Sequence, residues 1–354
     1  MATASELRQI ISDTVARLFT DQVTTEIRES AEKGRWPAEL WQAVEESGLT
    51  LPLIPETHGG GGGTWQDAYV VIHAAGRFAV PLPIAETIVA AWLLAESGLE
   101  VPSGPLTFAP TQAIDRLRLA QDGGGWRLSG TVTRVPWGRS AGHVVVVADA
   151  DRPMVALTLG ASARVDHDTN LALEPRDTLS WTGAPVMAAA PLGGRVPANA
   201  SWLYGALVRS AQMAGGLEYL LAQSVKYVSE RKQFGRPLAA FQAIQHNLAV
   251  LADHTAAAGI AAASAFRAAE RGEAGFEVAV AKIRTGEAAG LAAGIAHQAH
   301  GAIGFTYEHS LHFVTRRLWS WRAEFGGEAH WAEHLGRDVA LRGADSLWTH
   351  LTSR

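Results

Sequence analysis

The chain has 354 residues, of which 47% are hydrophobic and 18% are charged, and its formal net charge is -5. This balance is that of a folded globular protein and excludes a disordered or fibrous one, and the lack of a basic stripe argues against nucleic acid as the main partner. There is no cysteine, which excludes disulfides, thiolate catalysis and cysteine-bound metal clusters.

Residues 6–99 have the periodicity of amphipathic helices. Apolar residues recur at three- and four-residue spacings, as in Leu7, Ile10 and Ile11. The run Gly59–Gly63 interrupts the pattern, because consecutive glycines do not continue a helix. A phosphate-cradling loop would follow a strand, and no strand precedes this run, so we interpret it as a turn.

The pattern changes twice further along the chain. Short segments rich in β-branched residues, separated by Gly, Asp and Pro, include Trp126–Val132 and His143–Ala148. A Gly- and Pro-rich stretch then leads into long helical segments rich in Ala and Leu. We predict an α+β protein with a helical domain over 1–103, a small β-barrel or sandwich domain over 104–195 and a helical bundle over 196–354.

The N-terminal residues lack the basic and apolar segments of a secretory leader. No apolar run reaches membrane-spanning length without polar interruption. We therefore expect a cytoplasmic protein without membrane insertion.

The most specific motif is Arg231-Lys232-Gln233-Phe234-Gly235, followed by Leu238 and by Phe241-Gln242. A guanidinium group suits a diphosphate, and an aromatic ring with amides suits the adenine and flavin ends of a dinucleotide. A plainer interpretation stays open, in which Arg231 and Lys232 end a solvated helix and the two phenylalanines belong to the core.

With the order of its elements, this motif resembles the cofactor motif of the acyl-CoA dehydrogenase family. The first region adds Trp41, Gly48-Leu49 and Ile54-Pro55-Glu56 before the glycine run, which is similar to the family's N-terminal signature. The resemblance implies a C-terminal four-helix bundle and an FAD held partly across a subunit interface. The residues implied at FAD are Arg231, Gln233, Phe234, Leu238, Phe241 and Gln242.

Two further segments resemble parts of the family's flavin site. Gln298–Thr306 is similar to a Gln, Gly-Gly, Gly-Phe stretch, with Ala302 in place of the second glycine. Gln298, Gly301 and Ala302 are therefore expected at FAD. By position, Trp137 is similar to the aromatic that shields one face of the flavin ring, although an indole at a β turn is often only a core residue.

The resemblance also implies a reaction in which a carboxylate removes the α-proton of an acyl-CoA thioester while a hydride passes to flavin. The two positions where the family carries that carboxylate correspond to Gly326 and Gly205, and neither has a side chain. Glu324 and Glu328 flank Gly326 and are the candidate substitutes. In lacking the base, the chain also resembles one subunit of the heteromeric dehydrogenases of steroid side-chain breakdown. These enzymes pair a base-bearing subunit with a shorter one that lacks the base.

Other functions compete with acyl-CoA dehydrogenation. A flavin-dependent monooxygenase or oxidase on the same fold would need no α-proton base, and a non-catalytic subunit would need no FAD. For a dehydrogenase, the expected partners are an acyl-CoA thioester, an electron-transfer flavoprotein or similar acceptor, and an identical or homologous subunit.

A metal site is the remaining alternative. His330, Glu333 and His334 match the H-x-x-E-H pattern of some zinc peptidases, but such short motifs arise by chance and this one lies in the dehydrogenase-like segment. Four histidines form two more His-x-x-His spacings, which we interpret as polar or capping residues: His297, His300, His309 and His312. We expect no metal.

Overall fold

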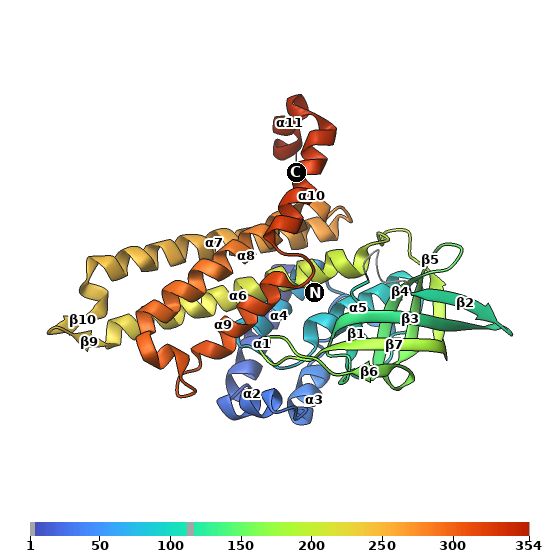
Figure 1. The fold of residues 1–354 in the computed structure, drawn as a ribbon, viewed down its shortest axis with the longest axis horizontal. Helices are drawn as coiled ribbons and strands as arrows, with labels where there is room; N and C mark the ends of the chain where they lie inside the picture. The colour runs from blue at the N-terminus through green and yellow to red at the C-terminus, as the bar shows by residue number, and fades with distance from the viewer. Residues whose placement is uncertain (1–3, 112–116, 354) are drawn as a thin grey trace.

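The computed structural model describes residues 4–111 and 117–353 and has three successive parts (Figure 1). The first part is helical, with a short 3-10 turn at Glu56–His58 after the third helix. Its helices are α1 (Ala4–Gln22), α2 (Thr25–Glu32), α3 (Ala38–Glu46), α4 (Trp65–Arg77) and α5 (Ile84–Glu96). α4 begins at a capping box, in which Thr64 donates its backbone N–H and its hydroxyl to Asp67 Oδ2 over 2.8 and 2.7 Å.

The second part is one mixed sheet in the order β6-β7-β3-β2-β4-β5-β8, with β1 beside β4. Its outer strands do not pair with each other within the described residues, so the sheet is open and not a closed barrel. The strands are β1 (Leu106–Phe108), β2 (Arg118–Asp122), β3 (Gly125–Pro136), β4 (His143–Asp149), β5 (Pro153–Leu159), β6 (Arg164–Asp166), β7 (Arg176–Pro185) and β8 (Ala188–Pro191).

The third part is a bundle of four long helices, as the family resemblance implied. Its helices are α6 (Ala200–Glu230), α7 (Gln242–Glu270), α8 (Gly275–His300) and α9 (Leu311–Ala323), and α10 (Glu328–Arg342) and α11 (Leu347–Thr352) follow. A two-stranded hairpin of β9 (Lys232–Gln233) and β10 (Arg236–Pro237) joins α6 to α7. Figure 1 shows the hairpin at one end of the long axis, the sheet at the other, and α10 and α11 standing off the body.

Glycines allow the first and third parts to pack closely. A Cβ added at Gly76 of α4 would overlap the carbonyl of Gln212 on α6, and one added at Gly215 would overlap the carbonyl of His73. The two helices therefore touch backbone to backbone, which only glycine permits. This contact fixes α6, the helix that carries the flavin motif at its far end, against the first domain.

Candidate active site

The predicted cofactor motif forms the exposed hairpin after α6. Phe234 and Gly235 make its turn with φ of 54° and 81°. The Phe234 side chain is 89% exposed, so the interpretation of this residue as core is wrong. Its ring meets the Phe241 ring at 6.1 Å, and most of its surface is left available to a ligand.

Contacts inside the motif hold the hairpin in place. Leu238 N–H donates to the Arg231 carbonyl over 2.9 Å, and the Arg236 guanidinium lies 4.1 Å from the centre of the Phe241 ring. Gln242 follows as the first residue of α7. The Arg231 side chain has no ion pair within the described residues, so its charge is available to a ligand.

The second predicted segment lies at the same end of the bundle. The rings of Tyr227 near the end of α6 and His300 at the end of α8 are stacked with centroids 4.4 Å apart. Gly301 stops α8 with φ of 64°, and Gln298 and Ala302 beside it are exposed. The structure thus brings together nine of the ten residues expected at FAD.

Trp137 is the tenth, and it lies apart from the others. It follows β3 in the sheet domain, whereas the hairpin projects from the opposite end of the molecule (Figure 1). Its indole is only 6% exposed, and its backbone N–H donates to the Pro175 carbonyl over 3.0 Å. One flavin could meet both groups only if the hairpin came from a different chain.

Glu324, the first candidate base, is instead the centre of a buried ion network. Its carboxylate accepts from Arg176 Nε and Arg209 Nε, both over 2.7 Å, and from Asn170 Nδ2 over 3.0 Å. Burial alone would raise the pKa of Glu324, but Arg176 and Arg209 hold it well below its usual range. A carboxylate held so strongly in its ionised form is a poor proton acceptor, and this geometry opposes the base role we expected for it.

The same network joins all three parts of the chain. Arg209 on α6 also donates to Glu86 on α5 over 2.6 Å, and Arg176 at the start of β7 donates to Glu174 over 2.9 Å. Glu174 accepts in addition from Arg317 and from the indole of Trp321 on α9. These charges are almost fully buried, and each has a partner of opposite sign.

Lys282 stabilises the end of α9 next to this network. Its ammonium group donates to the carbonyls of Trp321, Arg322 and Glu324 over 3.0, 3.2 and 2.8 Å. Burial lowers its pKa to about 7. Three helix-end carbonyls are suitable acceptors for a cation, so Lys282 fixes the segment that carries Glu324.

Glu328, the second candidate base, is also engaged. It opens α10 and forms an ion pair with Arg322. Gly326 between the two glutamates has φ of 90°, and a Cβ there would lie 2.6 Å from His330 Cδ2 and 2.8 Å from Trp331 Nε1. The space that a glutamate at position 326 would enter is thus already filled by rings from α10.

The other usual base position is blocked as well. A Cβ added at Gly205 would overlap the ring carbons of Phe325. The Phe325 ring is also packed by Phe108 and Trp202, with centroids 5.8 and 5.7 Å away. The two positions therefore belong to one corner of the fold, and aromatic side chains close it.

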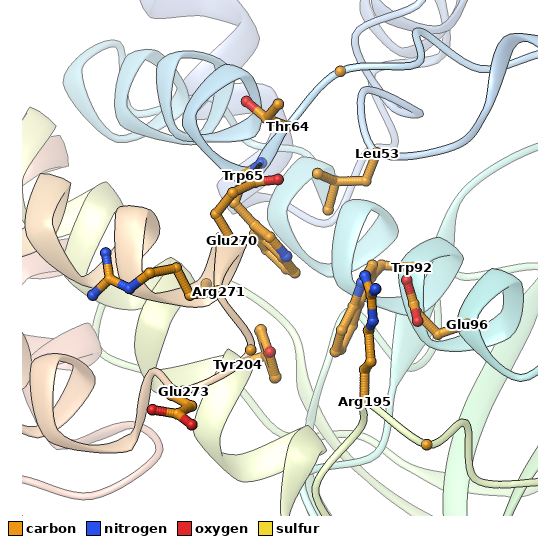
Figure 2. A pocket seen from close by; sticks show the side chains of 14 residues that line it. Leu53, Thr64, Trp65, Trp92, Glu96, Arg195, Tyr204, Glu270, Arg271 and Glu273 are labelled. Carbon is orange, nitrogen blue, oxygen red and sulfur yellow. Dashed lines mark hydrogen bonds between the residues drawn. The ribbon is translucent and has the colours of Figure 1, made fainter.

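One cavity opens beside Tyr204, the residue before Gly205. It has a volume of about 500 Å³ and lies where the first domain, the 194–195 linker and the turn after α7 meet. Figure 2 shows Trp65, Glu270 and Tyr204 on one side and Trp92, Arg195 and Glu96 on the other. The three aromatic rings pack on one another at 4.2 to 5.2 Å, and no residue expected at FAD lines the cavity.

The histidines do not gather around a metal. No group of three potential ligands stands close enough to hold one within the described part of the chain, and Glu333 pairs with Arg337 on its own helix. The histidines of the two His-x-x-His spacings lie among aromatic rings instead. His297, for example, is stacked on Phe305 at 4.1 Å and on Trp319 at 5.7 Å.

Sequence reasoning missed the buried network, because its members are far apart in the chain. Glu324 and Arg176 are separated by 148 positions, and Glu324 and Arg209 by 115. One signal was available, since Glu86 and Arg209 are isolated charges inside apolar helical stretches. Such charges are seldom buried without partners.

Known proteins share both the sequence and the fold of this chain. Family models described as the acyl-CoA dehydrogenase N-terminal and C-terminal domains match residues 5–101 and 196–330. The chain belongs to the acyl-CoA dehydrogenase family. It is therefore related to oxidoreductases that act on CH–CH bonds, and FAD is the cofactor of this fold.

The relatives of this dehydrogenase-family chain include a steroid-type enzyme and a complex of two named chains. The chain is 29% identical to the acyl-CoA dehydrogenase IpdE2 of Mycobacterium tuberculosis, over 89% of this chain and 92% of the relative. A structure of the Tcur3481-Tcur3483 steroid ACAD G363A variant superposes with a TM-score of 0.87 at 27% identity, covering 97% of this chain and 100% of the other. The ChsE4-ChsE5 complex from Mycobacterium tuberculosis gives a TM-score of 0.87 at 25% identity, covering 96% and 98%.

The hairpin residues fit the cofactor of the family. FAD carries a diphosphate and two planar ring systems, and the hairpin offers the unpaired guanidinium of Arg231, the exposed amide of Gln233 and the exposed ring of Phe234. Within the described residues the side chains of Arg231 and Gln233 have no hydrogen bond or ion pair, and the Phe234 ring meets the Phe241 ring at 6.1 Å. This dehydrogenase-type chain therefore has donors for FAD on a surface that faces outward.

Proposed function

We propose that this chain is a subunit of a heteromeric, cytoplasmic acyl-CoA dehydrogenase and does not itself supply the catalytic base. The observation that carries this proposal is the Phe325 ring on Gly205, in the corner where the family's base is expected. A base must come within hydrogen-bonding reach of the α-proton, and the two carboxylates of the described residues that flank Gly326, Glu324 and Glu328, are both held in ion pairs. The homologous partner subunit provides the base.

The contribution of this chain is to bind and orient the flavin. Bound FAD supplies the hydride acceptor for the α,β-dehydrogenation of an acyl-CoA thioester. Arg231 neutralises the diphosphate, Gln233 and Gln298 hydrogen-bond the cofactor, and Phe234 excludes water from one of its rings. Because the hairpin projects from the bundle, these residues complete a site on the neighbouring subunit (Figure 1).

The relatives support a steroid-type substrate and a heteromeric assembly. Two of the similar structures are a steroid ACAD variant with two named components and a complex of two named chains. We extend both properties to this chain and propose a steroid side-chain acyl-CoA as the substrate class. The acceptor of electrons from bound FAD would be an electron-transfer flavoprotein or a similar protein.

Anaerobic flavin bleaching tests the proposal. The chain would be produced alone and together with each homologous dehydrogenase encoded next to it, and each preparation mixed with acyl-CoA esters with and without a steroid ring system. We expect bleaching only in a co-produced complex. Bleaching by the chain alone would show that it has its own base, and a complex that never holds flavin would refute the proposal.

Two arginine variants separate flavin binding from general effects. In the complex, Arg231→Ala is expected to lower the flavin content, because the cofactor's diphosphate loses its guanidinium partner. Arg164→Ala is the matched control, since Arg164 is an exposed arginine on β6 that pairs with Asp166 on the same strand. Equal flavin loss in both variants would contradict the assigned role of Arg231.

A further inference from the structure

The cavity beside Tyr204 is lined by aromatic side chains whose polar atoms have no partner. Trp65, Trp92 and Tyr204 are 5%, 6% and 2% exposed, and all three line it. Within residues 4–111 and 117–353, neither indole N–H nor the Tyr204 hydroxyl makes a hydrogen bond, yet none of these atoms is enclosed by protein. They therefore open onto the cavity, where they are free to donate to a ligand.

Packing between four segments preforms the cavity. At the start of α4, the Trp65 backbone N–H donates to Glu270 Oε2 at the end of α7 over 2.7 Å. On the opposite side the linker lies against the end of α5, because a Cβ added at Gly193 would be 2.1 Å from the Glu96 carbonyl oxygen. The volume of about 500 Å³ is within the range of about 300–1,000 Å³ that small-molecule sites occupy. Figure 2 shows Trp65 on one wall and Arg195 on the other, with the cavity between them.

Charged side chains of both signs surround these donors. Glu96, Arg195 and Glu273 line the cavity, are exposed, and form no ion pair in the part of the chain that the structure describes. Arg271, the other arginine of the lining, is already in an ion pair. Burial and the negative charge of Glu96 raise the pKa of Tyr204 to about 12. The Tyr204 hydroxyl therefore keeps its proton near neutral pH and stays a hydrogen-bond donor.

This lining suits neither a simple anion nor a simple cation. An anion would pair with the donors, but it would meet the carboxylates of Glu96, Glu270 and Glu273. A cation would pair with the carboxylates, but it would meet Arg195 and leave the aromatic N–H and O–H groups without acceptors. A hydroxyl group both donates and accepts hydrogen bonds and carries no charge. Several hydroxyls on one molecule can therefore pair with the donors and the carboxylates together.

We infer that this cavity binds a neutral polyhydroxylated molecule, a monosaccharide or a disaccharide. Its hydroxyl oxygens accept from the indoles of Trp65 and Trp92 and from Tyr204. Its hydroxyl hydrogens donate to Glu96, whose charge strengthens the bond. The inference goes beyond the proposed function and does not rest on it, because no residue expected at FAD lines the cavity. Sugar binding and flavin content therefore report on the two proposals separately.

Isothermal titration calorimetry of the full-length chain tests the inference. The probes are glucose and maltose, with sodium acetate as the anion and choline chloride as the cation. We expect saturable binding of at least one sugar with a dissociation constant of about 1 mM or lower, and weaker or no binding of the two ions. Absence of sugar binding would show that the cavity holds only water, and tighter binding of acetate or choline would assign it to a charged ligand. Either result overturns the inference.

Two matched pairs of variants locate the binding. Tyr204→Phe removes one hydroxyl and keeps the ring, so it should raise the dissociation constant about three- to tenfold. Tyr69→Phe is its control, since it changes a tyrosine outside the cavity. Glu96→Ala should raise the dissociation constant about tenfold or more, because a charge-assisted hydrogen bond is lost, and Glu100→Ala, which changes an exposed glutamate outside the cavity, is the control. Equal effects within either pair, or no effect of Tyr204→Phe, would place the sugar elsewhere and refute the inference.

Discussion

The buried ion network makes a quantitative prediction for Arg209→Met. Arg209 is 1% exposed and is held between Glu86 at 2.6 Å and Glu324 at 2.7 Å. Methionine fills a similar volume but leaves Glu86 without its cation. The second oxygen of Glu86 already has no hydrogen-bond partner, so the whole carboxylate would be buried and uncompensated. Glu324 would keep Arg176 and Asn170.

Removing one partner of a buried ion pair typically lowers the free energy of unfolding by about 3–5 kcal/mol, and we expect a loss in this range for Arg209→Met at neutral pH. The assay is urea unfolding followed by tryptophan fluorescence and circular dichroism. Adding Glu86→Gln removes the stranded charge, so the double variant should be more stable than Arg209→Met alone. A loss below about 1 kcal/mol, or a double variant less stable than Arg209→Met, would refute the reasoning.

Three further perturbations test neighbouring features. Gly205→Ala should cost about 1–3 kcal/mol of unfolding free energy, because its Cβ overlaps the Phe325 ring, and Phe325→Leu in the same chain should recover part of that loss in urea titrations. Lys282→Met should cost about 1–3 kcal/mol through three lost hydrogen bonds. Because burial lowers the pKa of Lys282 to about 7 from 10.5, the unfolded chain binds more protons between these values. The advantage of the wild type over Lys282→Met should therefore grow as pH rises from 7 toward 10, and a constant difference would count against the buried position of this lysine. Burial also lowers the pKa of four histidines below 6.5: His297, His300, His309 and His312. The unfolded chain therefore binds more protons below that pH, and the stability of the protein should fall on acidification. Melting temperatures at pH 7.5 and pH 5.5, compared between the wild type and variants with glutamine at these positions, check this.

The flavin motif could be predicted from the sequence because it is local. Arg231, Phe234 and Phe241 lie within eleven consecutive residues, and a hairpin between two helices keeps such neighbours together. The order of helices and strands was equally accessible, since apolar periodicity is a local property. The prediction of a barrel or sandwich was less specific. Whether a sheet closes depends on which strands pair, and pairing between distant strands is not encoded in any local stretch of sequence.

The catalytic corner could not be predicted in the same way. Glu324 and Glu328 were expected as bases because each lies two positions from Gly326 in the sequence. That closeness says nothing about which cations surround their carboxylates. Partners from α6 and β7 determine the ionisation state of Glu324, and packing of the domains brings each of them there. The contact between Phe325 and Gly205 could not be predicted either. The Phe325 ring comes from a distant segment and fills the space that a side chain at position 205 would occupy.

The flavin hairpin is exposed, whereas the corner around Gly205 and Glu324 is held by buried contacts within the chain. This difference can be measured. Phe234 is 89% exposed, so Phe234→Ala should leave the melting temperature of the chain unchanged, while flavin retention by the complex falls. Arg209→Met should do the reverse, with a large loss of stability and unchanged flavin content at a temperature where it stays folded. If Phe234→Ala lowered the melting temperature as much as Arg209→Met, the ring would be packing against its own chain. The assignment of the hairpin to a neighbouring subunit's flavin would then be wrong.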